Sequence, residues 1–147
     1  MLCIRTNKED QTRALGERLG KLVFRGCLIA LYGDLGAGKT AFTRGLCNSL
    51  GIERVSSPSY TIMNLYEGSL PVYHFDAYRL ADEDEFYALG GDEYFGSGLC
   101  IVEWPDKIEG ALPQQRLDIS IRNLGETERE FCFSPKGERY KTMIGGL

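Results

Sequence analysis

The sequence predicts an α/β fold in three layers: a mostly parallel central sheet with helices on both faces and antiparallel strands at its edge. Three features favour it. The unbroken apolar run from Cys27 to Tyr32 has the length of a strand buried on both faces of a parallel sheet. A helical pattern follows from Thr40 to Gly51, where glycine is a suitable C-cap. Later, the segments 116–121 and 129–134 alternate apolar and polar residues, as half-exposed strands do.

The other elements are expected around this unit. A first helix should begin at Asn7, whose side chain can cap it, and should close at Arg25-Gly26. The remaining elements are a Ser/Pro turn that runs into a strand (55–66), an alternating strand (71–80), a helical stretch broken by two glycines (82–95) and a buried strand (98–104). The helical stretch 82–95 begins with four acidic residues (82–85), and acidic residues are typical of the first turn of a helix.

Length and composition indicate a single domain over residues 1–147. The chain has 43% apolar and 26% charged residues, which is typical of a soluble globular protein. No apolar run approaches ~18 residues and no signal-like stretch begins the chain, so we expect a cytoplasmic protein without membrane contact. The net charge of −4, with no cluster of lysine and arginine, argues against nucleic-acid binding by this chain alone.

The cysteines are expected to be buried reduced thiols. Their number is odd, no C-x-x-C pair occurs, and most of them lie in apolar strand-like runs. A disulfide or zinc framework is the alternative. The five are Cys3, Cys27, Cys47, Cys100 and Cys132.

A complete phosphate-binding motif, G-x-x-x-x-G-K-[ST], occupies residues 33–40 between the first apolar strand and the following helix. Its glycines let backbone N–H groups surround a phosphate, Lys39 supplies a positive charge, and the Thr40 hydroxyl is placed to ligate Mg²⁺. The pattern NKED at 7–10 resembles a guanine-reading motif but precedes the loop, so we expect ATP rather than GTP. The predicted ATP-binding residues are Gly33, Asp34, Leu35, Gly36, Ala37, Gly38, Lys39, Thr40 and Ala41.

Two acids follow apolar strands and are the candidate partners of the nucleotide. Glu103 ends the run LCIVE and is predicted to hold Mg²⁺ with Thr40. Asp76 ends another strand and either ligates the ion through water or orients the attacking water. The alternative for Glu103 is an acid exposed in a loop. The alternative for Asp76 is a structural role in a turn, where it pairs with Arg79. Lys39, Asp76 and Glu103 form the predicted catalytic set.

Two further side chains near these acids are ambiguous. His74, the single histidine, lies on a strand, and a structural imidazole is favoured over a catalytic base. Trp104 directly follows Glu103, so a role in nucleotide sensing or partner contact is weighed against an ordinary place in the core.

These motifs together resemble one family, the tRNA threonylcarbamoyladenosine biosynthesis ATPase TsaE, also called YjeE. The phosphate-binding loop is shared by many proteins, but the strings HFDAYRL and VEWP at this spacing after it are far more discriminating. The resemblance covers almost the whole chain through LYGDLGAGKTAFTRGL, VSSPSYTIMNLY, YHFDAYRL, LGGDEYF and IVEWPDKI.

The resemblance implies a small Mg²⁺-dependent ATPase that acts with TsaB and TsaD in forming N6-threonylcarbamoyladenosine at position 37 of tRNAs. The tRNA would be reached only through that complex, and self-association is left open. Thr40 and Glu103 would hold Mg²⁺, Asp76 would lie by the γ-phosphate, and the segment 6–12 would border the adenine. A switch loop that faces the partner would include Ser57, Ser59, where the family usually has Thr, and Tyr60, together with Trp104.

Two other classes remain alternatives. In a small-molecule kinase, Asp76 would deprotonate an acceptor hydroxyl. In a nucleotide-binding scaffold, ATP would be bound without turnover.

Overall fold

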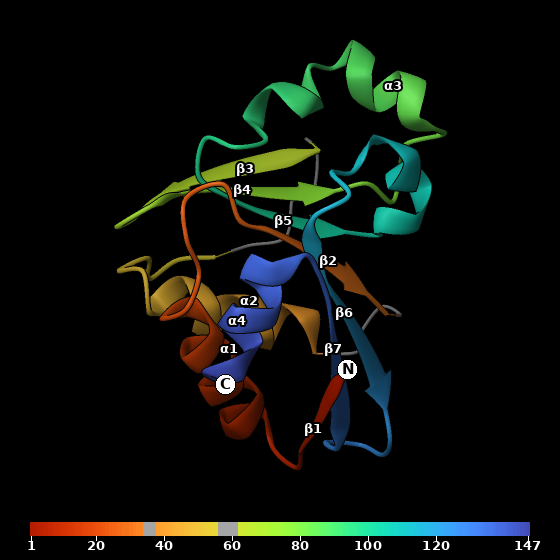
Figure 1. The fold of residues 1–147 in the computed structure, drawn as a ribbon. Helices are drawn as coiled ribbons and strands as arrows, with labels where there is room; N and C mark the ends of the chain where they lie inside the picture. The colour runs from red at the N-terminus through yellow and green to blue at the C-terminus, as the bar shows by residue number, and fades with distance from the viewer. Residues whose placement is uncertain (34–37, 56–61) are drawn as a thin grey trace.

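A seven-stranded mixed sheet forms the centre of the computed structural model, which describes residues 1–33, 38–55 and 62–147 (Figure 1). The strands follow one another across the sheet in the order β1-β7-β6-β2-β5-β4-β3. Their bounds are β1 (Leu2–Thr6), β2 (Leu28–Tyr32), β3 (Met63–Glu67), β4 (Pro71–Asp76), β5 (Leu99–Glu103), β6 (Arg116–Asn123) and β7 (Arg129–Lys136).

The four central strands, β6, β2, β5 and β4, run parallel, and antiparallel partners flank them on both sides. The chain reverses in short connections between β3 and β4 and between β6 and β7, and such hairpins produce antiparallel pairs. Three of the six strand pairs are therefore parallel, so the mostly parallel arrangement is confined to the centre. The predicted α/β class with antiparallel edges is confirmed.

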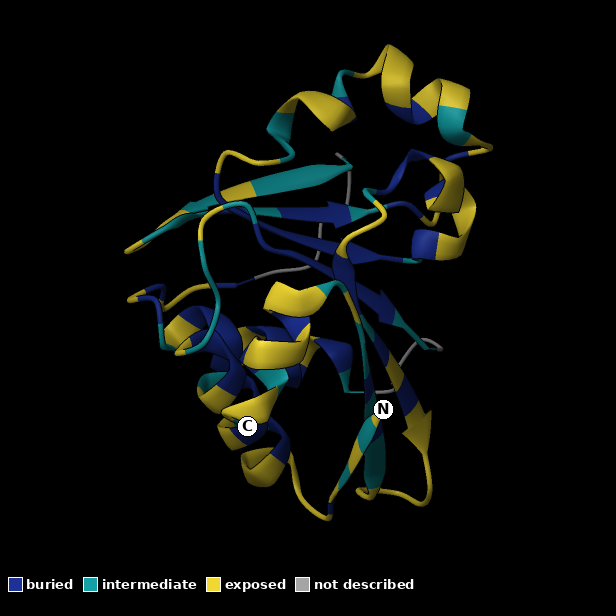
Figure 2. Cartoon of the chain, viewed as in Figure 1, coloured by how far each residue is buried: buried dark blue, intermediate teal, exposed yellow. Residues whose placement is uncertain are grey.

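Helices cover both faces of the sheet (Figure 1). Strand alternation divides the core accordingly: Ile29 and Leu31 of β2 pack with the helices of one face, and Leu28 and Ala30 with those of the other. The centre of the sheet is buried, while the outer turns of the helices are exposed (Figure 2). The first face carries α1 (Glu9–Gly20), α2 (Lys39–Asn48) and α4 (Glu138–Gly145); the second carries α3 (Glu83–Ala88), η1 (Gly91–Tyr94) and η2 (Pro105–Ala111).

Glycines bring α1 and α2 unusually close together. A Cβ atom at Gly16 would lie 2.2 Å from the carbonyl oxygen of Phe42, and one at Gly45 would lie 1.9 Å from the carbonyl oxygen of Arg13. Neither distance is compatible with a side chain, so the two backbones touch directly. This contact holds the middle of α1 directly against α2.

The N-terminal region differs from the expectation. α1 begins after Lys8, not after Asn7, and no side chain caps it; the Asn7 N–H instead donates to the side-chain oxygen of Gln11. The cause is β1, an unpredicted strand that holds the chain extended as far as Thr6. By contrast, the acidic residues 82–85 do begin a helix, as predicted. Asp82 is the N-cap of α3, and its carboxylate accepts a hydrogen bond from the N–H of Glu85. None of the helices within the described ranges is long and apolar enough to cross a membrane.

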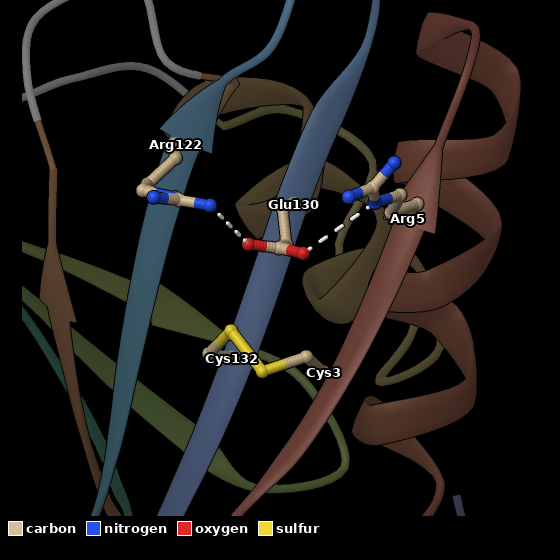
Figure 3. The surroundings of a disulfide bond; sticks show 5 residues. All are labelled: Cys3, Arg5, Arg122, Glu130 and Cys132. Carbon is tan, nitrogen blue, oxygen red and sulfur yellow. Dashed lines mark hydrogen bonds and ion pairs between the residues drawn. A yellow bond between two sulfur atoms is a disulfide. The ribbon is translucent and has the colours of Figure 1, made fainter.

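The prediction that the cysteines are reduced thiols is wrong for Cys3 and Cys132, which form a disulfide (Figure 3). The antiparallel register of β1 and β7 sets these two residues directly opposite each other. They lie on the sheet face opposite α1, α2 and α4, next to Glu130, which pairs with Arg5 and Arg122 (Figure 3). The other three, Cys27, Cys47 and Cys100, are buried free thiols, and burial raises the pKa of each to about 12.

Replacing Gly45 by alanine should destabilise the fold, because the new methyl group has to push α1 away from α2. The expected loss in the free energy of unfolding is about 1–3 kcal/mol, measured by urea denaturation. Gly145→Ala, in α4, is the matched control, because nothing lies within 4 Å of a Cβ there. Its free energy of unfolding should be unchanged or should rise by up to about 1 kcal/mol. Equal losses in both variants would contradict the close contact.

Cysteine alkylation should separate the disulfide from the buried thiols. At about pH 8, the raised pKa keeps Cys27, Cys47 and Cys100 protonated, and burial shields them. Native protein purified without reductant should therefore incorporate no iodoacetamide, and after mild reduction only Cys3 and Cys132 should react, as located by peptide mass spectrometry. Label on Cys3 before reduction would show that the disulfide is absent in solution.

Candidate active site

One pocket of about 410 Å³ gathers most of the described residues that the motifs single out. It lies at the edge of the sheet where the parallel strands end, which is where α/β sheets bind ligands. Its described lining consists of Glu9, Gly38, Lys39, Thr40, Ala41, Asp76, Glu103, Trp104, Glu126, Thr127 and Arg129.

Two glycines frame the phosphate-binding motif. Gly33, directly after β2, has a φ of 152°, and a Cβ there would lie 2.8 Å from the carbonyl oxygen of Ile121. Gly38 has a φ of 92° and is the N-cap of α2, a left-handed conformation that favours glycine. The first N–H groups of α2 thus begin at the pocket, where they can bind an anion. The predicted ligands Asp34, Leu35, Gly36 and Ala37 lie outside the described residues.

Lys39 is the first residue of α2 and is only 4% exposed. Its Nζ donates to the carbonyl oxygen of Gly33 over 2.8 Å and lies 4.6 Å from the centroid of the Trp104 ring. A carbonyl dipole and an aromatic face both stabilise a cation. The ammonium group is therefore held beside the phosphate-binding motif by a carbonyl oxygen and an aromatic ring, and a phosphate could replace both.

The two predicted acids end neighbouring strands and face each other in register, Asp76 on β4 against Glu103 on β5. Glu103 is 7% exposed, and its Oε2 lies 2.6 Å from Nε2 of His74. Asp76 is half-buried and accepts a hydrogen bond of 2.9 Å from the N–H of Tyr78. The alternative turn pair is not formed, since none of the ion pairs between described residues joins Asp76 to Arg79.

The oxygen donors of the pocket suit a magnesium ion shared with a nucleotide. Within the described part of the chain, no group of three or more His, Cys, Asp or Glu side chains could hold a metal alone. Mg²⁺ typically takes one or two carboxylates and completes its shell with water and phosphate oxygens. The exposed Thr40 and the carboxylates of Glu103 and Asp76 fit that requirement. Their roles in metal binding stay predictions.

Trp104 belongs to the pocket rather than to the interior of the core. Its φ of 56° is the one positive value at a non-glycine position among the described residues, and Pro105 follows it immediately. This sharp turn after β5 sets the half-buried indole beside Lys39, with the Tyr78 ring 5.0 Å away between centroids. Backbone strain of this kind is concentrated at functional sites. The predicted switch residues Ser57, Ser59 and Tyr60 lie outside the described residues.

Sequence reasoning missed part of the lining, which comes from the connection of β6 to β7 and from the start of β7. The pairing of Thr6 with Arg129 brings this connection beside the start of α1. Arg129 lies against the phosphate motif, with side-chain atoms 3.6 Å from the position of a Cβ on Gly38. No local motif marks these positions. They are Glu126, Thr127 and Arg129.

The segment 6–12, expected beside adenine, contributes only Glu9 to the described lining of the pocket. Thr6 and Thr12 are buried and hydrogen-bonded to each other over 2.7 Å. These two threonines therefore connect β1 to α1 and do not line the pocket.

Comparison with known proteins gives a consistent result. The family described as Threonylcarbamoyl adenosine biosynthesis protein TsaE matches residues 6–131. The tRNA threonylcarbamoyladenosine biosynthesis protein TsaE of Bacillus subtilis is 47% identical over 97% of this chain and 91% of its own length. The Treponema pallidum protein of the same name is 39% identical over 88% of this chain and 97% of its own.

A solved structure supports the same assignment. The crystal structure of Bacillus subtilis YdiB superposes with a TM-score of 0.86 at 42% identity, covering 98% of this chain and 91% of that one. Sequence and fold therefore agree over almost the whole length, and the chain belongs to the TsaE family.

Proposed function

We propose that this protein is a Mg²⁺-dependent ATPase that acts with a TsaB–TsaD pair in forming N6-threonylcarbamoyladenosine at position 37 of tRNAs. One observation carries the proposal: the start of α2, with Lys39 and Thr40, shares a pocket with the facing carboxylates of Asp76 and Glu103. This is the combination that phosphoryl transfer from ATP requires. The names of its relatives supply the pathway.

In the proposed site, each side chain has a distinct task. The N–H groups at the start of α2 bind phosphate oxygens, and Lys39 exchanges the Gly33 carbonyl and the Trp104 ring for the β- and γ-phosphates. Thr40 and Glu103 hold Mg²⁺, which neutralises charge on the phosphates. Asp76, at the end of the neighbouring strand, orients the attacking water.

The partner contact follows from the same pocket. Trp104 lines the pocket and packs against Tyr78, which is 51% exposed. A change at Lys39 on ATP binding would therefore reach the surface through these two rings. Because the chain has a net charge of −4, it is poorly suited to bind the anionic tRNA, and its partners would bind the tRNA instead. We place this reaction in the cytoplasm.

ATP hydrolysis by the purified protein, alone and with a TsaB–TsaD pair from the same organism, tests the proposal. The pair should stimulate hydrolysis, and Lys39→Ala or Glu103→Ala should each lower the rate by about 100-fold or more. The first change removes a cation that stabilises charge on the phosphates, and the second removes the carboxylate proposed to hold Mg²⁺. Lys21→Ala, an exposed lysine at the end of α1, is the control and should leave the rate unchanged.

The assay also separates the alternatives. Unchanged rates in both site variants would contradict the assigned pocket. Nucleotide consumption that depends on an added hydroxyl-bearing metabolite, and not on the pair, would identify a kinase instead.

A further inference from the structure

The single histidine of the chain makes a buried contact with the predicted metal ligand. His74, in the middle of β4, is 2% exposed, and its Nε2 lies 2.6 Å from Oε2 of Glu103. Glu103 is itself 7% exposed, so water contributes little to holding its carboxylate. In this interior position, the imidazole is the group that fixes one carboxylate oxygen.

The contact with Glu103 involves Nε2 of His74 and leaves Nδ1 on the other side of the ring. An ionised carboxylate only accepts hydrogen bonds, so Nε2 of His74 must be the donor to Glu103. Nδ1 is buried and has no hydrogen-bond partner among the residues that the structure describes. A proton on Nδ1 would therefore be an unsatisfied buried donor, which is costly. The arrangement therefore favours Nε2 of His74 as the donor to Glu103.

The sheet holds the ring in this orientation. His74 lies opposite Asn64 of β3 on one side and beside Ile101 of β5 on the other. The Tyr66 ring lies 6.1 Å from it between centroids. Because alternate residues of a strand share a face, His74 lies on the same face of β4 as Asp76, whose register partner is Glu103. The imidazole therefore reaches Glu103 from the buried side of the pocket.

We infer that His74 is a positioning residue: by donating from Nε2 to Oε2, it holds the Glu103 carboxylate so that the other oxygen, Oε1, would stay available to Mg²⁺. The inference rests on the proposed function, since it assigns a task within that metal site. Hydrogen-bond partners of metal ligands commonly account for a 10- to 100-fold change in metal affinity. Loss of the donor would leave Oε2 buried without a partner and the carboxylate free to turn away.

Two matched variants test the inference without relying on catalysis. His74→Gln keeps an N–H donor at about the position of Nε2, whereas His74→Leu fills similar space without one. The readout is Mn²⁺ affinity in the presence of ADP, followed by the loss of the free Mn²⁺ paramagnetic resonance signal. His74→Leu should weaken Mn²⁺ binding by about 10- to 100-fold, and His74→Gln should recover most of it. ADP affinity in the presence of EDTA should be the same in all three proteins.

A Glu103→Ala background gives the decisive comparison. If His74 acts through Glu103, then adding His74→Leu to Glu103→Ala should cause no further loss of Mn²⁺ affinity. An additional loss in the double variant, or wild-type affinity in a folded His74→Leu protein, would overturn the inference while leaving the ATPase proposal intact. Absence of any Mn²⁺–ADP binding by the wild-type protein would instead overturn the proposed function.

The wild-type protein offers a second test should His74→Leu not fold. Because the chain has one histidine, ¹⁵N-histidine labelling gives one imidazole spectrum. The inference predicts the Nε2-protonated form, with a shift in the Nε2 resonance on addition of Mg²⁺ and ADP. An Nδ1-protonated ring, or an Nε2 resonance that does not respond, would overturn it.

Discussion

Parallel pairing of β4, β5 and β2 is the constraint on which the site depends. Parallel strands end at the same edge of a sheet, so the residues at their carboxyl ends are brought together although they are distant in sequence. Here that edge brings together the start of the phosphate motif after β2, Asp76 at the end of β4 and Glu103 at the end of β5. A slip of one residue between β4 and β5 would separate the two facing carboxylates and turn one of them to the other face of the sheet.

The same edge buries opposite charges, and each is held by a group suited to its task. The Lys39 ammonium group donates a hydrogen bond to the Gly33 carbonyl and lies over the Trp104 ring, and a phosphate can displace it from both. Glu103 rests on the imidazole of His74, which the surrounding strands fix in place. Burying a charge is costly unless a partner compensates it. The pocket therefore combines one movable cation with one immobilised anion, an arrangement suited to binding a nucleotide with its metal.

Local signals in the sequence predicted the centre of this structure, because a buried strand, a glycine-rich loop and a helix each have a pattern of their own. Asp76 and Glu103 could be placed at strand ends for the same reason. The pairing of β1 with β7 joins residues more than a hundred positions apart, and no local pattern encodes it. The Cys3–Cys132 disulfide and the approach of Arg129 to Gly38 depend on that pairing. The contact of His74 with Glu103 required the register of β4 against β5.

The exchange of partners by Lys39 is the central claim, and Trp104 reports on it directly because it is the only tryptophan of the chain. Its fluorescence should be measured during titration with ATP and Mg²⁺, while ATP binding is followed independently by calorimetry. As the ammonium group leaves the indole face, the emission should change and saturate with the binding isotherm, and Lys39→Ala should show no such change. Constant emission from the wild-type protein at ATP concentrations that saturate binding would contradict the account.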